Sequence, residues 1–181
     1  LRDEFERYGK HWHGIDPRTI AKELQEYENA DYISVPSDFC YESFKEQGVP
    51  LEKILKIPYG SRLERFYPDR NDINVKREFR ILFVGVAGVR KGFIDLLTAF
   101  KKFKHPTKKL VIIGSLAPEI EEIFGREDQS NIIFLGKVPN EQLRQHYSQA
   151  SVFVLPSIEE GLAMVMGEAM ACGCPVVATT N

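Results

Sequence analysis

The sequence lacks an excess of charge of either sign, and it lacks long hydrophobic runs. Its 181 residues contain 24 Lys and Arg against 26 Asp and Glu, which gives a net charge of −2 at pH 7. Because nucleic-acid binding depends largely on basic residues that neutralise phosphates, this balance argues against a nucleic-acid-binding protein. No apolar run approaches the roughly 20 residues that a membrane-spanning helix needs, and residues 1–10 do not have the pattern of a signal peptide.

Cysteine is also scarce. Cys40, Cys172 and Cys174 form an odd set in a chain too long to depend on disulfides, which favours a reduced, cytoplasmic setting. Cys172 and Cys174 have no second Cys or His pair nearby at zinc-binding spacing. The segment HWH at 11–13 has no third ligand in view and is more typical of a surface turn. We therefore expect no metal site.

Apolar residues are abundant enough to bury a sizeable core, since 43% of the chain is hydrophobic. At 181 residues the chain is longer than one typical domain of about 150 residues and well short of two. It starts with LRDEFERYGK, without an initiator methionine, and ends in the strand-like run PVVATTN. We therefore expect one domain plus part of a second, cut from a larger protein.

From Ile81 onward, short β-branched runs alternate with segments of helical period. The runs are nearly all apolar, which indicates strands buried on both faces of a parallel sheet. Strands are expected at 80–85, 109–114, 131–136, 151–157 and 175–180, with helices between them at 91–104, 118–125, 140–150 and 161–172. This order predicts an α/β fold, an open doubly wound parallel sheet with helices on both faces.

The N-terminal part has a different organisation. One helix is expected to begin at Asp16 with Pro17 in its first position, and a second enters through Ser37 and ends at Gly48. Each is followed by a strand-like segment. We interpret the chain as three parts: the end of a preceding α/β domain at 1–60, a charged connector at 61–78, and an α/β domain truncated at its C-terminus at 79–181.

The loop after the first strand of that domain, GVAGVRKG at 85–92, carries two adjacent cations. Its pattern fits neither G-x-G-x-x-G nor a P-loop, which disfavours a dinucleotide fingerprint and a P-loop ATPase. Arg90 and Lys91 stand where a helix is expected to begin, although the helix dipole favours anions there. A phosphate held between these cations and the helix amides would resolve the conflict. The alternative is a solvated basic helix start.

The helix expected to begin near Gly161 is apolar all round except for Glu168, so it should be buried, and a buried carboxylate needs partners or a ligand. Glu160 and Glu168 are eight residues apart, which is about 12 Å along a helix. That spacing suits two carboxylates on one extended ligand and exceeds the roughly 5 to 9.5 Å of a glycosidase pair. The alternative is a buried ion pair for Glu168 and an N-terminal charge for Glu160. Three methionines are expected to fill the core: Met164, Met166 and Met170.

The segment PSIEEGLAMVMGEAMACGCPVVAT at 156–179 resembles the E-x7-E region of retaining, nucleotide-sugar-dependent glycosyltransferases of the GT-B fold, specifically glycosyltransferase family 4. The resemblance continues upstream, in order, through ADYISVPSDF, ILKIPYG, ERFYP, ILFVG with RKG, LVIIG, and FLGKVPNEQL followed by YSQASVFVLPS. It covers the chain from about Ala30 to the end. It implies two Rossmann-like domains that face each other across a cleft, with residues 79–181 as the nucleotide-sugar-binding domain.

The resemblance also implies residue roles. Glu160 would be catalytic beside the transferred sugar, and Glu168 would accept hydrogen bonds from the ribose hydroxyls. Lys91 matches a phosphate-binding lysine, and Arg90 is a candidate replacement for an arginine that is Val86 here. The backbone amides facing the sugar and diphosphate would be those of Gly161, Leu162, Ala163 and Met164.

A retaining hexosyltransferase is the activity that the resemblance implies, moving sugar from a nucleotide-diphosphate donor to a hydroxyl of a glycan or lipid-linked acceptor. Fixed cations and aligned amides can stabilise the departing diphosphate, so neither a metal nor another cofactor is expected. Since transfer needs both domains, the chain alone is expected to bind donor without transferring sugar. The resemblance implies a cytoplasmic protein, and it leaves open peripheral membrane contact through a missing N-terminal part.

Two other functions stay open at this point. One is a noncatalytic nucleotide-sugar-binding or interaction domain of the same fold, against which Lys91, Glu160 and Glu168 weigh. The other is a sugar phosphorylase, which would need a pyridoxal phosphate lysine that the sequence does not identify. The sequence does not specify the sugar, the base, the acceptor or the oligomeric state.

Overall fold

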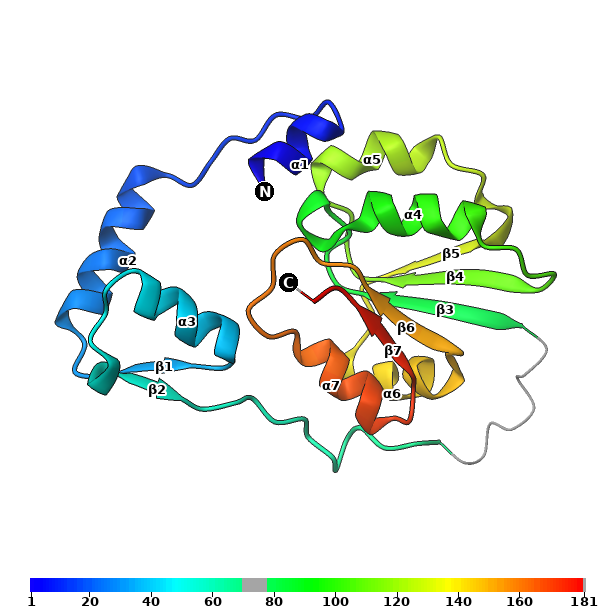
Figure 1. The fold of residues 1–181 in the computed structure, drawn as a ribbon. Helices are drawn as coiled ribbons and strands as arrows, with labels where there is room; N and C mark the ends of the chain where they lie inside the picture. Colours follow the sequence, from blue (N-terminus) through cyan, green and yellow to red (C-terminus); the bar gives the residue numbers. More distant parts are fainter. Residues whose placement is uncertain (70–77, 181) are drawn as a thin grey trace. The chain divides into compact units, whose positions relative to one another are not determined.

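The computed structural model describes residues 1–69 and 78–180, which belong to two compact units, Leu1–Gly60 and Ser61–Asn181 (Figure 1). The expected connector at 61–78 falls partly outside these residues. Its described part belongs to the second unit, where Phe66 is buried with its ring centroid 6.0 Å from that of Tyr147. No helix within the described ranges is both long and apolar enough to cross a membrane.

The first unit contains a small parallel sheet. Its two strands pair with Ile33 opposite Ile54, and Ile33, Val35 and Ile54 form its buried apolar cluster. Asp16 caps the second helix through a 2.8 Å bond from the Arg18 amide, and both predicted helix starts are confirmed. The elements are α1 (Arg2–Arg7), α2 (Pro17–Asn29), β1 (Ile33–Val35), α3 (Asp38–Glu46), a 3₁₀ turn (Leu51–Lys53) and β2 (Ile54–Lys56).

The second unit is a five-stranded parallel sheet in the order β5-β4-β3-β6-β7. Figure 1 shows α4 and α5 on one face of the sheet and α6 and α7 on the other, so the predicted α/β fold class is confirmed. The strands are β3 (Phe79–Val84), β4 (Lys108–Ile113), β5 (Ile132–Gly136), β6 (Val152–Leu155) and β7 (Val176–Ala178). The helices are α4 (Phe93–Lys102), α5 (Pro118–Gly125), α6 (Asn140–Gln149) and α7 (Met164–Ala171), with 3₁₀ turns at Val89–Lys91 and Gln129–Asn131.

The strand order reverses beside β3. The chain runs from β3 outward through β4 to β5 and then returns through α6 to place β6 against the other side of β3. In open α/β sheets such a reversal leaves a crevice outside the carboxyl ends of the two strands, and ligands bind there. The loops that follow β3 and β6 are therefore the first place to look for a site.

Burial differs between the centre and the edges of the sheet. Residues 81–84 of β3 and 110–113 of β4 are buried. The prediction that every strand is buried on both faces is wrong for β5 and β7, where Phe134 is 41% exposed and Val177 is 57% exposed. An apolar run predicts that part of a strand is buried. It does not predict whether the strand lies at the centre or at the edge of the sheet.

The expectation of a helix over 161–172 buried all round is also wrong. α7 begins at Met164, and Ala169 is its one buried residue. Met164 is 52% exposed and Met170 is 61% exposed, so these two methionines do not fill the core, whereas Met166 is half-buried. The helix covers one face of the sheet, and the apolar residues on its outer side remain accessible.

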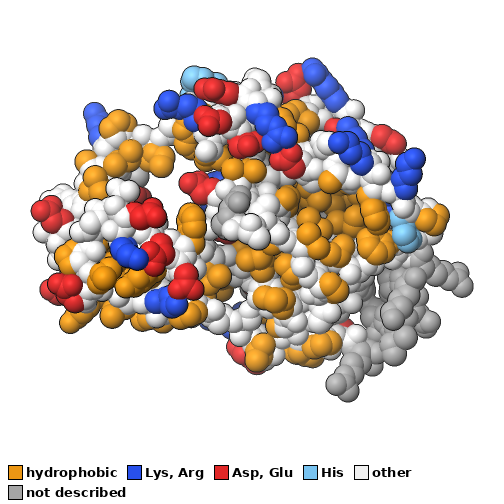
Figure 2. All heavy atoms as spheres, viewed as in Figure 1, with side chains coloured by type: hydrophobic (Ala, Val, Ile, Leu, Met, Phe, Trp, Pro, Cys, Tyr) orange, Lys and Arg blue, Asp and Glu red, His pale blue; other side chains and the backbone are white. Residues whose placement is uncertain are grey.

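The surface of the second unit is mixed. Figure 2 shows Lys, Arg, Asp and Glu side chains over α4 and α5, and hydrophobic side chains below these helices, toward the edge strand β7. The charged side follows from amphipathic helices that turn their apolar residues to the sheet, as Phe93, Leu97 and Phe100 of α4 do.

Candidate functional site

The strand reversal brings together two loops that are distant in the sequence, residues 85–92 after β3 and residues 156–163 after β6. The Ile158 amide donates to the Arg90 carbonyl at 2.9 Å. Gly92 has φ of +63°, and a Cβ placed there would lie 1.8 Å from the carbonyl oxygen of Pro156. Only glycine allows the two backbones to approach this closely. The loops are thus held together main chain to main chain.

Lys91 and Glu160 form an ion pair across this junction, with the Lys91 Nζ donating to Glu160 Oε2. Their side chains are only 15% and 19% exposed, respectively. Ser157, which is buried, also donates its hydroxyl to Glu160 Oε2, at 3.5 Å. The sequence singled out both charged residues. The pairing between them could not be predicted, because it depends on the order of the strands.

Arg90 and Lys91 do not lie in the first turn of a helix. They belong to the 3₁₀ turn that precedes Gly92, the N-cap residue of α4, and the first turn of α4 carries Asp95. The predicted conflict with the helix dipole is therefore wrong, since the acidic residue occupies the favourable place. Arg90 is exposed, and within residues 1–69 and 78–180 no ion pair involves its guanidinium.

The amides singled out at 161–164 lie at the start of α7 and not inside it. Ala163 is the N-cap residue and Met164 the first helical residue, so Gly161 and Leu162 precede the helix. The estimate of 12 Å along a helix between Glu160 and Glu168 does not apply, because only the part from Met164 is helical. Among the first amides of α7, that of Met166 donates to the Ala163 carbonyl at 3.1 Å, while those of Met164 and Val165 lack intrahelical acceptors and are suited to an anion.

Glu168 has a neutral partner instead of a cation. The Tyr147 hydroxyl on α6 donates to Glu168 Oε2 at 3.0 Å, and Tyr147 is fully buried. Burial raises the pKa of Glu168, and the hydrogen bond from Tyr147 opposes this rise. Burial, together with the charge of Glu168, raises the pKa of Tyr147. No ion pair involves Glu168 in the described part of the chain, so the structure gives no support to the ion-pair alternative.

Tyr147 is a residue that the sequence reasoning missed. The available signal was a tyrosine at a position of α6 that faces the sheet, where phenylalanine would fill the same space without a polar group. A buried phenol usually has a hydrogen-bond partner, so its hydroxyl indicates a nearby acceptor.

Metal ligands are not clustered in the described residues, where no three His, Cys, Asp or Glu side chains could hold an ion together. The Cys172 and Cys174 thiols are buried, and burial raises the pKa of each to about 11. The His11 and His13 rings meet edge to face, with centroids 4.6 Å apart.

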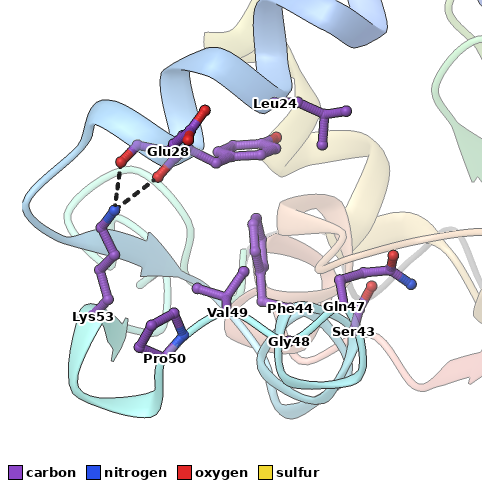
Figure 3. Close-up of a pocket in the computed structure, with 10 residues that line it drawn as sticks. Leu24, Glu28, Ser43, Phe44, Gln47, Gly48, Val49, Pro50 and Lys53 are labelled. Atoms are coloured by element: carbon purple, nitrogen blue, oxygen red, sulfur yellow. Dashed lines mark hydrogen bonds between the residues drawn. The ribbon is translucent and has the colours of Figure 1, made fainter.

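A pocket of about 610 Å³ lies in the first unit, between α2 and the end of α3 (Figure 3). Its apolar wall includes Phe44, whose ring meets the Tyr27 ring edge to face at 4.9 Å. Lys53 donates to the carbonyl oxygens of Tyr27 at 3.0 Å and Glu28 at 2.8 Å. This cation satisfies carbonyls in the last turn of α2, which is a structural role. The sequence did not predict this pocket.

Comparison with known proteins gives consistent matches. The family model "Glycosyl transferases group 1" matches residues 67–181. The chain is 31% identical over 170 residues to the capsular polysaccharide biosynthesis glycosyltransferase CapM of Staphylococcus aureus, covering 83% of this chain and 43% of that protein.

Solved structures extend the likeness to the fold. Sucrose-phosphate synthase from Thermosynechococcus elongatus matches with a TM-score of 0.78 and 28% identity over 99% of this chain and 48% of that one. Anabaena HepE in complex with UDP-glucose matches with a TM-score of 0.69 at 20% identity, over 82% of this chain and 44% of that one, and shows the same fold. The chain thus spans less than half the length of each of these proteins. With a family model matched over most of its length, the chain belongs to the group 1 glycosyl transferases.

Proposed function

We propose that the second unit is the donor-binding part of a retaining glycosyltransferase of family 4, which transfers a sugar from a nucleoside diphosphate sugar to an acceptor hydroxyl. The observation that carries this proposal is the Lys91–Glu160 pair at the reversal of strand order. A cation and a carboxylate held at the point where such folds bind ligands are the groups that a sugar diphosphate requires.

In this proposal Lys91 binds the diphosphate and stabilises the charge that develops on it as the bond to the anomeric carbon breaks. Arg90 is exposed beside it and is the second candidate phosphate ligand. The amides from Gly161 to Met164 complete the anion site. These groups supply the electrostatic stabilisation without a metal ion or other cofactor.

Glu160 then lies next to the sugar, since it touches the lysine that holds the adjoining phosphate. Glu168, further along α7, accepts hydrogen bonds from the ribose hydroxyls. Glu168 is a half-buried carboxylate whose partner among the described residues is a hydroxyl and not a cation, so it retains acceptor capacity, as this role requires.

The complete protein is proposed to build a glycan or lipid-linked saccharide, with the acceptor bound mainly outside this chain. Support comes from CapM, whose name describes capsular polysaccharide biosynthesis, and from HepE, which was solved with UDP-glucose. Uridine nucleotides are therefore the first donors to test. The three free cysteines support a cytoplasmic location.

A thermal-shift panel of UDP, GDP and ADP sugars tests the proposal, with the matching nucleosides as controls. A ligand that binds the native state raises the apparent stability with the logarithm of the ratio of its concentration to its dissociation constant. We expect one base to raise the melting temperature as a diphosphate sugar and far less as the nucleoside. No shift with any of the three diphosphate sugars would contradict the proposal.

A further inference from the structure

Tyr147 is the one partner that the described residues give to the Glu168 carboxylate. Its ring is 0% exposed and lies edge to face against Phe66 and Phe153, with centroids 6.0 and 5.8 Å away. These contacts hold the Tyr147 ring in one orientation, which sets the position from which its hydroxyl donates. The hydrogen bond connects α6 to α7 at 3.0 Å.

We propose that Tyr147 is a positioning residue for ribose recognition: its hydroxyl holds Glu168 Oε2 so that the rest of the carboxylate faces the two ribose hydroxyls. This inference rests on the role of Glu168 proposed above. A carboxylate has about four acceptor positions, and Tyr147 occupies one of them. The remaining positions accept from a vicinal diol, and the fixed plane of the carboxylate favours two hydroxyls over one.

A side chain on a helix surface has rotamer freedom that it loses when it binds a ligand, at a cost in affinity. The hydrogen bond from Tyr147 removes part of this freedom before the nucleotide arrives. The hydroxyl also stabilises the ionised form of Glu168, because it donates to the charged carboxylate. Glu168 therefore remains an acceptor at a lower pH than burial alone would allow.

The surroundings of Glu168 hold few competing charges. α7 packs against α6, β6 and β7, and the two strands carry no titratable side chain. The segment that begins at Ser61 also lies against α7, at Gly167, and its charged residues Arg62, Glu64 and Arg65 are exposed. On α6, Arg144 pairs with Asp69 at 3.3 Å, and burial lowers the pKa of His146. Two other titratable groups belong to these helices or to their ends: Glu141 is exposed on α6, and Cys172, just after α7, has its pKa raised to about 11 and stays protonated at neutral pH.

Tyr147→Phe is the direct test, because it removes the hydroxyl and keeps the ring. Tyr67→Phe is the matched control, since the Tyr67 ring packs under Arg144 in the same unit and its hydroxyl has no part in the proposal. Affinities are measured by calorimetry for UDP, GDP and ADP, each paired with its 2′-deoxy form. Glu168→Gln is measured alongside.

We expect wild type and Tyr67→Phe to bind the ribonucleotide more tightly than the deoxynucleotide. In Tyr147→Phe this preference should shrink by about 2- to 10-fold, the effect of one lost hydrogen bond. A merely structural role for Tyr147 would weaken both nucleotides equally and leave their ratio unchanged. The acid limb of ribonucleotide affinity should also move to higher pH in Tyr147→Phe, because Glu168 loses the bond that favours its ionised form.

The positioning role of Tyr147 and the ribose role of Glu168 are contradicted by different results. If wild type discriminates, Glu168→Gln loses discrimination and Tyr147→Phe retains all of it, the positioning role is overturned and the role of Glu168 stands. If wild type binds both members of a pair equally, or Glu168→Gln discriminates as wild type does, the ribose role itself fails. Unfolding midpoints of the three variants show whether each is folded during the titration.

Discussion

Two lysines in the two units illustrate the difference between a pocket and a site. Lys53 borders a pocket of about 610 Å³ in the first unit, but its ammonium is bound to the carbonyls of Tyr27 and Glu28 at the end of α2. Lys91, at the strand reversal of the second unit, is bound to a carboxylate on another loop. Lys53 completes a helix terminus, whereas the partner of Lys91 is a charged group that a ligand anion can replace.

The comparison shows that the pocket beside Lys53 and the Lys91–Glu160 pair are different places in the described structure. Apolar side chains such as Phe44 and Val49 wall the pocket, while the charged pair lies where the topology of the sheet brings two loops together. The volume of the pocket shows only that a small molecule would fit there. The strand order marks where helix amides, a cation and a carboxylate converge, and this is the proposed place of donor binding.

The largest effect is expected when the two loops are forced apart. Gly92→Ala puts a Cβ in a left-handed residue and against the Pro156 carbonyl, so it should lower the unfolding free energy by about 3 to 5 kcal/mol. Gly136→Ala is the matched control, because Gly136 has φ of +67° and open space around its Cβ position. Chemical denaturation measures both, and equal losses would show that the close loop contact does not exist.

Measuring nucleotide affinity distinguishes the proposed roles of Lys91 and Lys53. Lys91→Ala should weaken binding of the matching nucleoside diphosphate by about 10- to 150-fold through the loss of a charge-assisted contact. Lys53→Ala should leave that affinity unchanged and lower stability instead, because the end of α2 loses its donor. Calorimetric titration gives both values, and a larger loss of affinity for Lys53→Ala would reverse the assignment.

Glu168→Gln separates a ribose acceptor from a structural charge. Donor affinity should fall by about 5- to 150-fold, because the amide leaves a ribose hydroxyl mispaired at a half-buried site. Unfolding free energy should not show the loss of about 3 to 5 kcal/mol that follows when a buried ion pair is broken, since the partner is a hydroxyl. A large loss of stability with normal donor affinity would eliminate the ribose role.

The difference in stability between wild type and Glu168→Gln should also depend on pH. The folded-state pKa of Glu168 lies above its ordinary value of 4.5, so the folded state binds this proton more tightly than the unfolded state does. Wild type should therefore lose stability relative to Glu168→Gln as the pH rises from 4.5 through the raised pKa. Denaturation at a series of pH values measures this difference, and the opposite slope would show that another group dominates.

The smallest expected effect is an increase in nucleotide affinity instead of a decrease. Glu160→Gln removes the anion that competes with a diphosphate for Lys91, so nucleoside diphosphate affinity should rise by about 3- to 10-fold, while sugar transfer by the complete protein falls. In a Lys91→Ala background the same change should have no effect on affinity. A fall in affinity for Glu160→Gln would mean that this carboxylate contacts the nucleotide favourably in its own right.

Local sequence signals were enough to predict most of the fold. Asp16 with Pro17 marks the start of α2, and the apolar runs locate the five strands of the second unit within a few residues. Edge positions were not predictable, because Phe134 and Val177 look the same in the sequence as the core residues of β3. The strand neighbours that decide burial are set by tertiary pairing.

For the candidate site, too, the sequence predicted individual residues but not their tertiary contacts. Arg90 and Lys91 stand out in the sequence as cations at a helix start, Glu168 as the one charge in an apolar helix, and Glu160 by its spacing to Glu168 and by the family resemblance. Their partners were not predicted, since the contacts of Lys91 with Glu160 and of Glu168 with Tyr147 join residues 69 and 21 positions apart. Sequence periodicity predicts single helices and strands. These contacts depend on the order of the strands in the sheet, which periodicity does not give.

Amide chemical-shift mapping tests most directly whether the nucleotide binds at the strand reversal of the second unit. The ¹⁵N-labelled chain is titrated with the nucleoside diphosphate that gives the largest thermal shift. We predict perturbed amides in residues 85–92 and 161–164, with the amides around the pocket at Phe44 and Lys53 unchanged. Shifts concentrated around that pocket, with the two loops unaffected, would contradict the account.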